Sequence, residues 1–336
     1  IGLVGLPMTG KTTFFNLLTG AVIDSSGFSS GKTETHVGIA KVPDKRLDFL
    51  SDIYKPKKTT YATIEVTDIK GYAAGGAPSK GTGVNPFLES VRQVDALVHV
   101  VRAFRDDSIV HVEGTIDPLR DIETGGLELL FADLAVVENR IDRIENSKKV
   151  TKEMTEELEV LKKCRDTLEK GKLLNSLELS EEESGYLKSF SFLTERPLVL
   201  LVNLDEDQYR SGNYEQKEEI MKYAREGQIP VVEICAKTEL EINQLEEEDK
   251  ALFMEDLGIK ETGTGRLAKA MYSYLGLISF LTVGEDEVRA WPVRKGINAK
   301  RAAGKVHSDI ERGFIRAEVV SYSDFKELGS MQAARE

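Results

Sequence analysis

IGLVGLPMTGKTTFFNLLTG, residues 1–20, joins a short apolar stretch to a glycine-bounded turn and then to a helix-like segment. Residues 5–12 within it match G-x-x-x-x-G-K-[ST] at every position. In such a loop the backbone N–H groups wrap a phosphate, the lysine reaches the β- and γ-phosphates, and the final hydroxyl ligates Mg²⁺. The stretch therefore predicts a strand–loop–helix phosphate site in which Lys11 and Thr12 are the active side chains.

The residues around this pattern supply the context that a phosphate loop requires. Residues 1–4 are apolar and predict a buried strand, and residues 12–18 predict a helix. The helix would add the positive end of its dipole to the anion site. The predicted nucleotide contacts in the loop are Leu6, Pro7, Met8, Thr9, Gly10, Lys11, Thr12 and Thr13.

Three later segments are typical of GTPase-type domains. Residues 59–71, TTYATIEVTDIKG, predict a strand ending in D-x-x-G, with Asp68 near Mg²⁺ and the N–H of Gly71 at the γ-phosphate. Residues 196–206, RPLVLLVNLDE, and 231–237, VVEICAK, each predict a buried strand followed by a base-binding loop. The predicted base contacts are Asn203, Leu204, Glu206, Cys235, Ala236 and Lys237.

The composition and net charge of the chain argue against several classes of protein. The chain has 336 residues, 40% of them hydrophobic and 30% charged, which is an ordinary globular composition. A net charge of −12 argues against broad nonspecific binding to nucleic acid. No apolar run is long enough to span a membrane, and no signal peptide is evident. Two distant cysteines, Cys164 and Cys235, indicate a reducing compartment, so we expect a cytoplasmic protein.

The motifs together resemble the YchF subfamily of the Obg-related P-loop NTPases over essentially the whole chain. The likeness rests on GLPMTGKTTF, DIKG with SKGTGVNPFL, DALVHVVRAF, IVHVEGTIDPLRDIE, NLDE, AKTELEI, and VRAWPVRKG with GFIRAEV. The resemblance implies an α/β fold: a P-loop NTPase domain of GTPase type, an inserted helical coiled-coil hairpin and a C-terminal TGS domain of β-grasp fold. It also implies a cytosolic protein that prefers ATP to GTP and is linked to ribosomes.

Domain boundaries follow from the residue patterns. We expect the NTPase domain in residues 1–126 and 192–276, the helical insertion in 127–191 and the TGS domain in 277–336. The family's TGS domain continues for about thirty residues beyond the last position, so we expect its final strands to be absent here. The insertion is predicted from an apolar seam with helical spacing. Its first helix carries Leu127, Leu130, Leu134, Val137, Ile141 and Ile144, and its second carries Met154, Leu158, Leu161 and Leu168.

The loop NLDE gives an independent reason to expect ATP. In N-K-x-D the aspartate accepts hydrogen bonds from guanine N1–H and N2–H₂, whereas adenine N1 is itself an acceptor. Here the acid is Glu206, one methylene longer, and Leu204 replaces the lysine that covers the base. Guanine discrimination depends on such polar pairing and should largely be lost. The alternative, in which Glu206 adapts and still selects guanine, stays open at this point.

Hydrolysis requires a group that positions water. Ras-like enzymes have a glutamine directly after D-x-x-G, but this chain has Tyr72, which lacks the paired donor and acceptor of an amide. We therefore expect slow turnover, with Lys11 and Gly71 as catalytic groups on the phosphate. Within the family pattern His111 is the candidate that positions water, and a purely structural role for it is an equal alternative. A Tyr72 hydroxyl that points inward would also hold a water, and this alternative to His111 stays open here. His99 alternates within a buried strand and is expected to be a core histidine.

Mg²⁺ is the expected cofactor, held by Thr12, Asp68 and Thr33. The third ligand is the least defined, because the family's threonine in the first switch falls on Lys32 and either Thr33 or Thr35 would have to replace it. Relatives in the wider family hold an activating K⁺ with an asparagine at the position of Met8. Because a thioether is a weak ligand, we do not expect activation by K⁺.

The last part of the chain predicts short strands at ISFLTV and VRAWPV, helices within AKRAAGKVHSDI and a strand at FIRAEVV. Residues 287–316 contain eight Lys or Arg against three Asp or Glu, a local charge of +5 that is a candidate RNA-facing patch. Trp291 within it either stacks on a base or, as we favour, anchors the small domain's core.

The sequence thus predicts a monomeric, slowly cycling Mg²⁺-dependent ATPase. Its expected partners are ATP, more weakly GTP, and the large ribosomal subunit, with RNA contacted through the TGS and NTPase face and with no membrane partner. A GTP-specific translational GTPase is one alternative. A noncatalytic adaptor that senses nucleotide, with incidental hydrolysis, is the other.

Overall fold

The computed structural model describes residues 1–23, 35–69, 86–256 and 258–335. They form two compact units, one made of Ile1–Ala40 with Glu65–Met271 and the other of Lys41–Ile64 with Tyr272–Glu336. Residues 41–64 therefore pack with the C-terminal part of the chain, which the sequence did not indicate. The domain boundaries given above stay a prediction.

A six-stranded sheet organises the first unit, in the order β2-β4-β1-β5-β6-β7. The pairs β1–β4, β1–β5, β5–β6 and β6–β7 are parallel. Every residue of β5 and β6 is buried, which explains their continuous apolar sequences, since strands covered on both faces do not alternate. The strands are β1 (Gly2–Val4), β2 (His36–Lys41), β4 (Thr63–Asp68), β5 (Leu97–Arg102), β6 (Leu198–Asn203) and β7 (Val231–Ile234).

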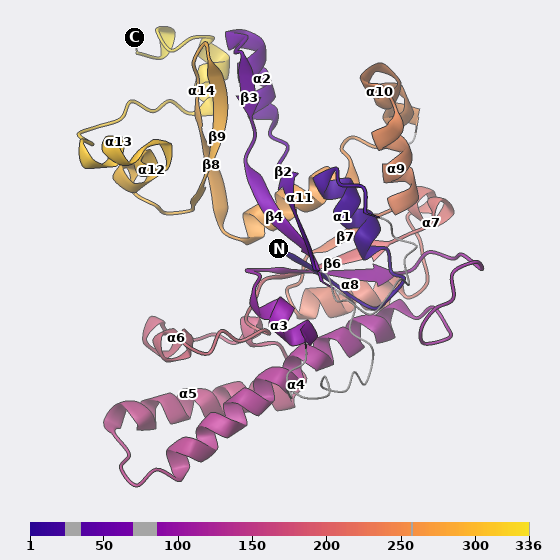
Figure 1. Cartoon of the computed structure of the whole chain (residues 1–336), viewed down its shortest axis with the longest axis vertical. Helices are drawn as coiled ribbons and strands as arrows, with labels where there is room; N and C mark the ends of the chain where they lie inside the picture. The colour runs from indigo at the N-terminus through magenta and orange to yellow at the C-terminus, as the bar shows by residue number, and fades with distance from the viewer. Residues whose placement is uncertain (24–34, 70–85, 257, 336) are drawn as a thin grey trace. The chain divides into compact units, whose positions relative to one another are not determined.

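Helices cover both faces of this sheet. Figure 1 shows α1 and α11 on one face and α4 and α8 on the other. None of the helices in the described part of the chain is both long and apolar enough to cross a membrane. Those of the NTPase part are α1 (Lys11–Thr19), α3 (Pro86–Arg92), α7 (Glu206–Ser211), α8 (Lys217–Glu226), α9 (Ala236–Gln244), α10 (Glu247–Asp256) and α11 (Gly263–Tyr274).

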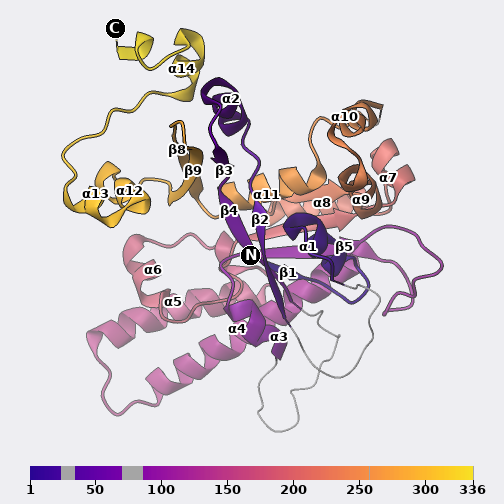
Figure 2. The same cartoon turned by 45° about the horizontal axis from the view of Figure 1, so that its top comes forward.

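The predicted helical hairpin is present. It consists of α4 (Pro118–Glu145) and α5 (Lys152–Glu169), which lie side by side in Figures 1 and 2, followed by η1 (Leu174–Ser176) and α6 (Glu181–Leu187). Most seam residues are buried or pack against the hairpin core. Leu127 is the exception, because its side chain is exposed. Helix α4 begins directly after its N-cap Asp117, well before the predicted seam, so one helix runs from the NTPase core into the hairpin.

A buried carboxylate fastens α4 to the segment before β6. Asp133 accepts hydrogen bonds from the N–H groups of Leu193 (3.0 Å) and Thr194 (2.7 Å) and from the Thr194 hydroxyl (2.8 Å). Burial raises the pKa of Asp133, and these donors oppose that shift. The three bonds offset the cost of burying the carboxylate.

The second unit contains a three-stranded sheet in the order β3-β9-β8. The strands expected at ISFLTV and VRAWPV are confirmed as β8 (Leu277–Thr282) and β9 (Glu287–Arg294), which pair antiparallel. The single strand expected over residues 59–71 is wrong. It divides into β3 (Lys58–Thr60), paired with β9, and β4, which belongs to the larger sheet. The helices are α2 (Lys45–Tyr54), α12 (Ala299–Val306), α13 (Ser308–Arg312), α14 (Tyr322–Leu328) and η2 (Ala333–Arg335).

The strand expected at FIRAEVV is also wrong. Residues 314–320 have no regular structure, and Ile315 and Val319 are 91% and 87% exposed. β-branched residues favour strands only where a neighbouring strand offers a surface to pack on. Trp291 is half-buried within the unit. Its Nε1 donates to the Thr282 hydroxyl (2.9 Å), and Arg289 lies 3.9 Å above the ring, which agrees with the structural role that we favoured.

Candidate nucleotide-binding site

The phosphate loop between β1 and α1 depends on two glycines. Gly5 has φ +143°, and a Cβ there would lie 2.3 Å from the Val100 carbonyl oxygen of β5. Gly10 has φ +98° and caps α1, and a Cβ there would lie 2.6 Å from Nδ2 of Asn203. Any other residue would be strained and would collide with the neighbouring strands β5 and β6. The glycines of the motif are therefore required by close packing as well as by the turn.

Lys11 lies at the centre of the loop and is 8% exposed. Its Nζ donates to the carbonyl oxygens of Gly5 (3.1 Å) and Leu6 (2.8 Å). Burial lowers the pKa of Lys11 to about 8, against the opposing effect of the Asp68 charge. The ammonium group is thus held inside the loop that the sequence predicts to wrap a phosphate.

Thr12 and Asp68 meet, although they are 56 residues apart in the chain. The Thr12 hydroxyl donates to Oδ2 of Asp68 at 2.7 Å, which joins the start of α1 to the end of β4. Hard oxygen ligands of this kind suit Mg²⁺, which uses one or two protein groups and completes its shell with water and phosphate. Among the described residues, no cluster of three or more His, Cys, Asp or Glu side chains could hold a metal ion.

The structure describes only some of the other residues that the sequence predicts near the phosphate. Gly71, Tyr72 and Thr33 lie outside the described residues, so their roles stay predictions. Thr35 is described and lies exposed just before β2. Met8 has φ +63°, lines the cleft and presents a thioether, so nothing on this side chain offers the oxygen ligand that K⁺ requires.

Asn203 joins the phosphate loop to the second base-binding loop. It lies at the end of β6 and is buried. Its Nδ2 donates to the Thr9 carbonyl (3.0 Å), and its Oδ1 accepts from the N–H of Ala236 (3.2 Å) at the start of α9. Parallel strands bring these three segments to one edge of the sheet, where α/β proteins bind ligands. Cys235 is the buried N-cap of α9 in the same loop.

The residues of NLDE that follow Asn203 have three different environments. Leu204 is 3% exposed and packs in the apolar core, although it also borders the cleft. Asp205 caps α7, accepting from the N–H of Gln208 (2.9 Å). Glu206 forms an ion pair with Lys237 of α9, with Oε1 and Nζ 2.6 Å apart. Asp205 is not among the predicted site residues, although the D-x-x-Q spacing is that of a capping box.

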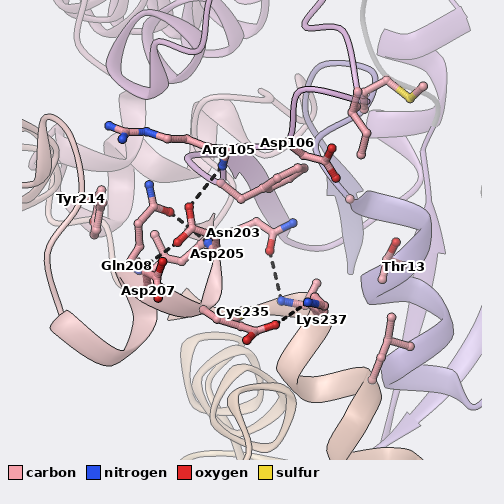
Figure 3. Close-up of a pocket in the computed structure, with 18 of the residues that line it drawn as sticks. Thr13, Arg105, Asp106, Asn203, Asp205, Asp207, Gln208, Tyr214, Cys235 and Lys237 are labelled. Carbon is pink, nitrogen blue, oxygen red and sulfur yellow. Dashed lines mark hydrogen bonds and ion pairs between the residues drawn. The ribbon is translucent and has the colours of Figure 1, made fainter.

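These segments enclose one open cleft of about 1550 Å³, shown in Figure 3. Its walls are the phosphate loop, residues 203–215 and residues 235–240. A further wall, which no motif of the sequence predicts, is formed by residues after β5: Phe104, Arg105, Asp106 and Ile109. The volume is sufficient for a nucleotide, since small-molecule sites typically occupy about 300–1,000 Å³.

Arg102 fixes the wall after β5. This fully buried side chain donates to the carbonyl oxygens of Phe104 (3.3 Å), Asp106 (3.1 Å) and Ile109 (3.0 Å). Burial lowers the pKa of Arg102, and Asp106 and Asp121 oppose the shift. Three carbonyl partners hold the loop against the end of the strand.

His111 is buried with both ring nitrogens engaged. Nδ1 accepts from the N–H of Glu113 (3.2 Å), which makes Nε2 the protonated nitrogen, and Nε2 lies 2.9 Å from Oδ2 of Asp121 on α4. The other oxygen of Asp121 accepts from Arg120 (2.8 Å). In this arrangement the ring faces α4, as the structural alternative requires, and the catalytic role of His111 stays a prediction. His99 is buried in β5, as expected, and burial lowers its pKa to about 4, with the charge of Lys11 adding to the shift.

Comparison with known proteins gives matches along the whole chain. A family model described as 50S ribosome-binding GTPase matches residues 1–160, and the YchF-GTPase_C model, described as a protein of unknown function, matches residues 277–336. The ribosome-binding ATPase YchF of Bacillus subtilis is 45% identical, over 100% of this chain and 92% of the relative. That of Haemophilus influenzae is 42% identical, over the same shares.

Solved structures of GTPases and GTP-binding proteins are also similar to this chain. The YchF GTPase of Schizosaccharomyces pombe superposes with a TM-score of 0.85 at 31% identity, over 99% of this chain and 90% of that one. A GTP-binding protein of Pyrococcus horikoshii, at 20% identity and a TM-score of 0.55 over 94% and 91% of the two chains, shares the fold. The predicted P-loop NTPase domain with a helical insertion and a C-terminal TGS-like domain is thereby confirmed. The chain belongs to the YchF family of Obg-related P-loop NTPases.

Proposed function

We propose that this chain is a Mg²⁺-dependent nucleoside triphosphatase that hydrolyses ATP in preference to GTP and acts as a slow nucleotide-state switch at the ribosome. The observation that carries the proposal is that Lys11 and Thr12 line the cleft and that the Thr12 hydroxyl donates to Asp68. These are the groups that phosphoryl transfer requires for positioning and charge neutralisation. The relatives described as ribosome-binding ATPases support the same activity.

The phosphate end works through exchange of hydrogen bonds. Lys11 now donates to two loop carbonyls, and a bound triphosphate would offer charged oxygens in their place, which form stronger bonds to an ammonium group. Thr12 would ligate Mg²⁺ directly, and Asp68 would hold it through water. The metal, when bound, neutralises charge on the β- and γ-phosphates. Thr33 is the proposed third protein ligand, and Gly71 the proposed backbone donor to the γ-phosphate.

The base end lacks the arrangement that reads guanine. Leu204 is buried and cannot cover a base with a cation, and Glu206 is already paired with Lys237. Asn203, Cys235, Ala236 and Lys237 line the cleft where the base would lie. Loss of paired donors and acceptors removes most discrimination in favour of guanine. This supports ATP as the preferred substrate.

Hydrolysis through His111 would require a change in the loop after β5. The ring would have to exchange Asp121 and the Glu113 N–H for water near the γ-phosphate. If that occurs, His111→Ala lowers kcat by about 10²-fold or more, with little effect on nucleotide affinity. Equal kcat values in the two proteins would assign His111 a structural role and leave the water to another group.

The partner and setting are part of the proposal. We place the protein in the cytoplasm as a monomer that contacts the large ribosomal subunit, since the family model of residues 1–160 is described by 50S binding. The basic residues of α12 and its flanks, within 287–316, are the proposed RNA-facing patch. Sedimentation with isolated 50S subunits, with and without nucleotide, tests this contact.

Side-by-side binding of ATP and GTP analogues with Mg²⁺ tests the central claim. We expect tighter binding of the ATP analogue and faster hydrolysis of ATP, and loss of both when Mg²⁺ is chelated. Tight GTP binding with weak ATP binding would instead identify a GTP-specific translational GTPase. A variant that binds ATP but cannot hydrolyse it, and yet retains cellular function, would identify an adaptor in which hydrolysis is incidental.

A further inference from the structure

The ion pair between Glu206 and Lys237 occupies the place where guanine would be read. Glu206 is the first residue of α7, and Lys237 lies in the first turn of α9. Their side-chain atoms Oε1 and Nζ are 2.6 Å apart, and both residues line the cleft. The dashed line that ends at Lys237 in Figure 3 marks this ion pair. The pair thus bridges the two loops that stand in the positions of the base-binding loops of GTPases.

Stability does not explain why a lysine is here. The side chains are 39% and 72% exposed, and exposed ion pairs contribute little to folding. A cation in the first turn of a helix also lies at the positive end of the dipole, where it is unfavourable. The contact with Glu206 raises the pKa of Lys237, so the ammonium form is kept at this edge of the cleft.

We propose that Lys237 is a specificity-determining residue that neutralises Glu206 and presents an N–H donor to the base, so that adenine is accepted and guanine is rejected. The inference rests on the proposed ATP preference and assigns it to a pair of residues. It differs from an explanation by side-chain length alone. In that explanation Glu206 does not bind guanine because its side chain is too long, whereas here it does not bind guanine because its carboxylate is paired with Lys237.

The hydrogen-bonding edges of the two bases explain the direction of the effect. A carboxylate that reads guanine must accept from N1–H and the N2 amino group. An ammonium group beside that carboxylate meets N1–H as donor against donor, whereas adenine N1 is an acceptor and can receive its N–H. A docked base also excludes water from the pair, which strengthens both the match and the mismatch. Asp205 cannot replace Glu206, because it caps α7 and accepts from the N–H of Arg105 (3.3 Å).

Lys237→Met tests the inference because it removes the charge and keeps an unbranched side chain. We expect the released Glu206 to accept from guanine, so that the ratio of GTP to ATP affinity rises by about 10–100-fold, the scale of one corrected polar mismatch. Inosine triphosphate has N1–H but no N2 amino group, so Lys237→Met should raise the affinity for inosine triphosphate as well, but by a smaller factor than for GTP. Binding constants are measured by calorimetry with nonhydrolysable analogues and Mg²⁺.

Two further variants separate this explanation from general effects of charge. Glu206→Gln leaves Lys237 in place without a carboxylate and should give no gain for GTP. Lys222→Met is the matched control, since Lys222 is equally exposed at 72% and pairs with Glu226 on α8, away from the cleft lining. Lys222→Met should leave the ratio of GTP to ATP affinity unchanged.

The outcomes distinguish this inference from the proposed function. A wild-type protein without any preference for ATP would refute both. A wild-type protein that prefers ATP, together with an unchanged ratio in Lys237→Met, would refute the role of Lys237 and leave the proposed function intact. A gain for GTP in Lys222→Met as large as in Lys237→Met would also overturn the inference, because the effect would then come from net charge.

Discussion

Asn203→Ala would disconnect the phosphate loop from the base-binding loop. The side chain supplies a donor to the Thr9 carbonyl and an acceptor for the Ala236 N–H, and both bonds are buried. A buried backbone group left without its partner costs about 1–3 kcal/mol. Asn203 borders the open cleft, so water can enter the space that the truncated side chain leaves. We therefore expect the lower part of the summed range, a loss of about 2–4 kcal/mol in the free energy of unfolding.

Urea denaturation followed by circular dichroism measures this loss as a lower midpoint with an unchanged slope. Asn139→Ala is the matched control. Asn139 is exposed on α4, donates to the Ala135 carbonyl four residues earlier, and should cost less than about 0.5 kcal/mol. Asn203→Ala should also weaken ATP and GTP binding by similar factors, because the joint supports the whole cleft. A stability within about 0.5 kcal/mol of wild type would refute the argument.

Four other changes have defined outcomes. Lys11→Ala should nearly abolish triphosphate binding in a folded protein, measured by calorimetry, since it removes the cation inside the phosphate loop. Asp68→Asn should raise the Mg²⁺ concentration required for half-maximal ATP turnover, because a charged oxygen beside Thr12 is lost. His111→Ala should lower the free energy of unfolding by about 1–3 kcal/mol, because it leaves Asp121 without the ring N–H; unchanged stability would contradict the buried placement. For His99, whose pKa burial lowers from 6.5 to about 4, the unfolded state binds the extra proton between these values. As the pH falls from about 6.5 to 4, the free energy of unfolding of the wild type should therefore fall by up to about 3 kcal/mol more than that of His99→Gln. If the free energy of unfolding depends on pH in the same way in both proteins, this argument is wrong.

Some elements of the fold could be predicted from local sequence patterns. The phosphate loop follows from the spacing of its glycines, and strands β5 and β6 follow from their apolar runs; the structure has the loop, and every residue of both strands is buried. The loop could be predicted because the groups that stabilise it lie within a few residues of one another. The two strands could be predicted although their hydrogen-bond partners are distant, because a strand buried on both faces has a continuous apolar sequence.

Patterns failed where a distant segment decides the structure. The pattern of residues 59–71 predicts one strand, yet the chain passes from one sheet to another near Tyr61 and Ala62. FIRAEVV has strong strand propensity but lies exposed. In both cases the amino acids are compatible with a strand, and the availability of a partner strand determines the result. Sequence alone contains no direct information on that availability.

The three residues after Asn203 show the same limit within the candidate site. The sequence predicts a base loop there, and the structure brings it to the cleft. It does not predict that Leu204 packs in the core, that Asp205 caps a helix or that Glu206 pairs with Lys237, because each outcome depends on which neighbour a side chain meets. Replacement of aspartate by glutamate at position 206 would by itself leave a free carboxylate in the cleft. The choice of base is therefore a property of two loops from separate strands, and single-loop motifs are insufficient to predict it.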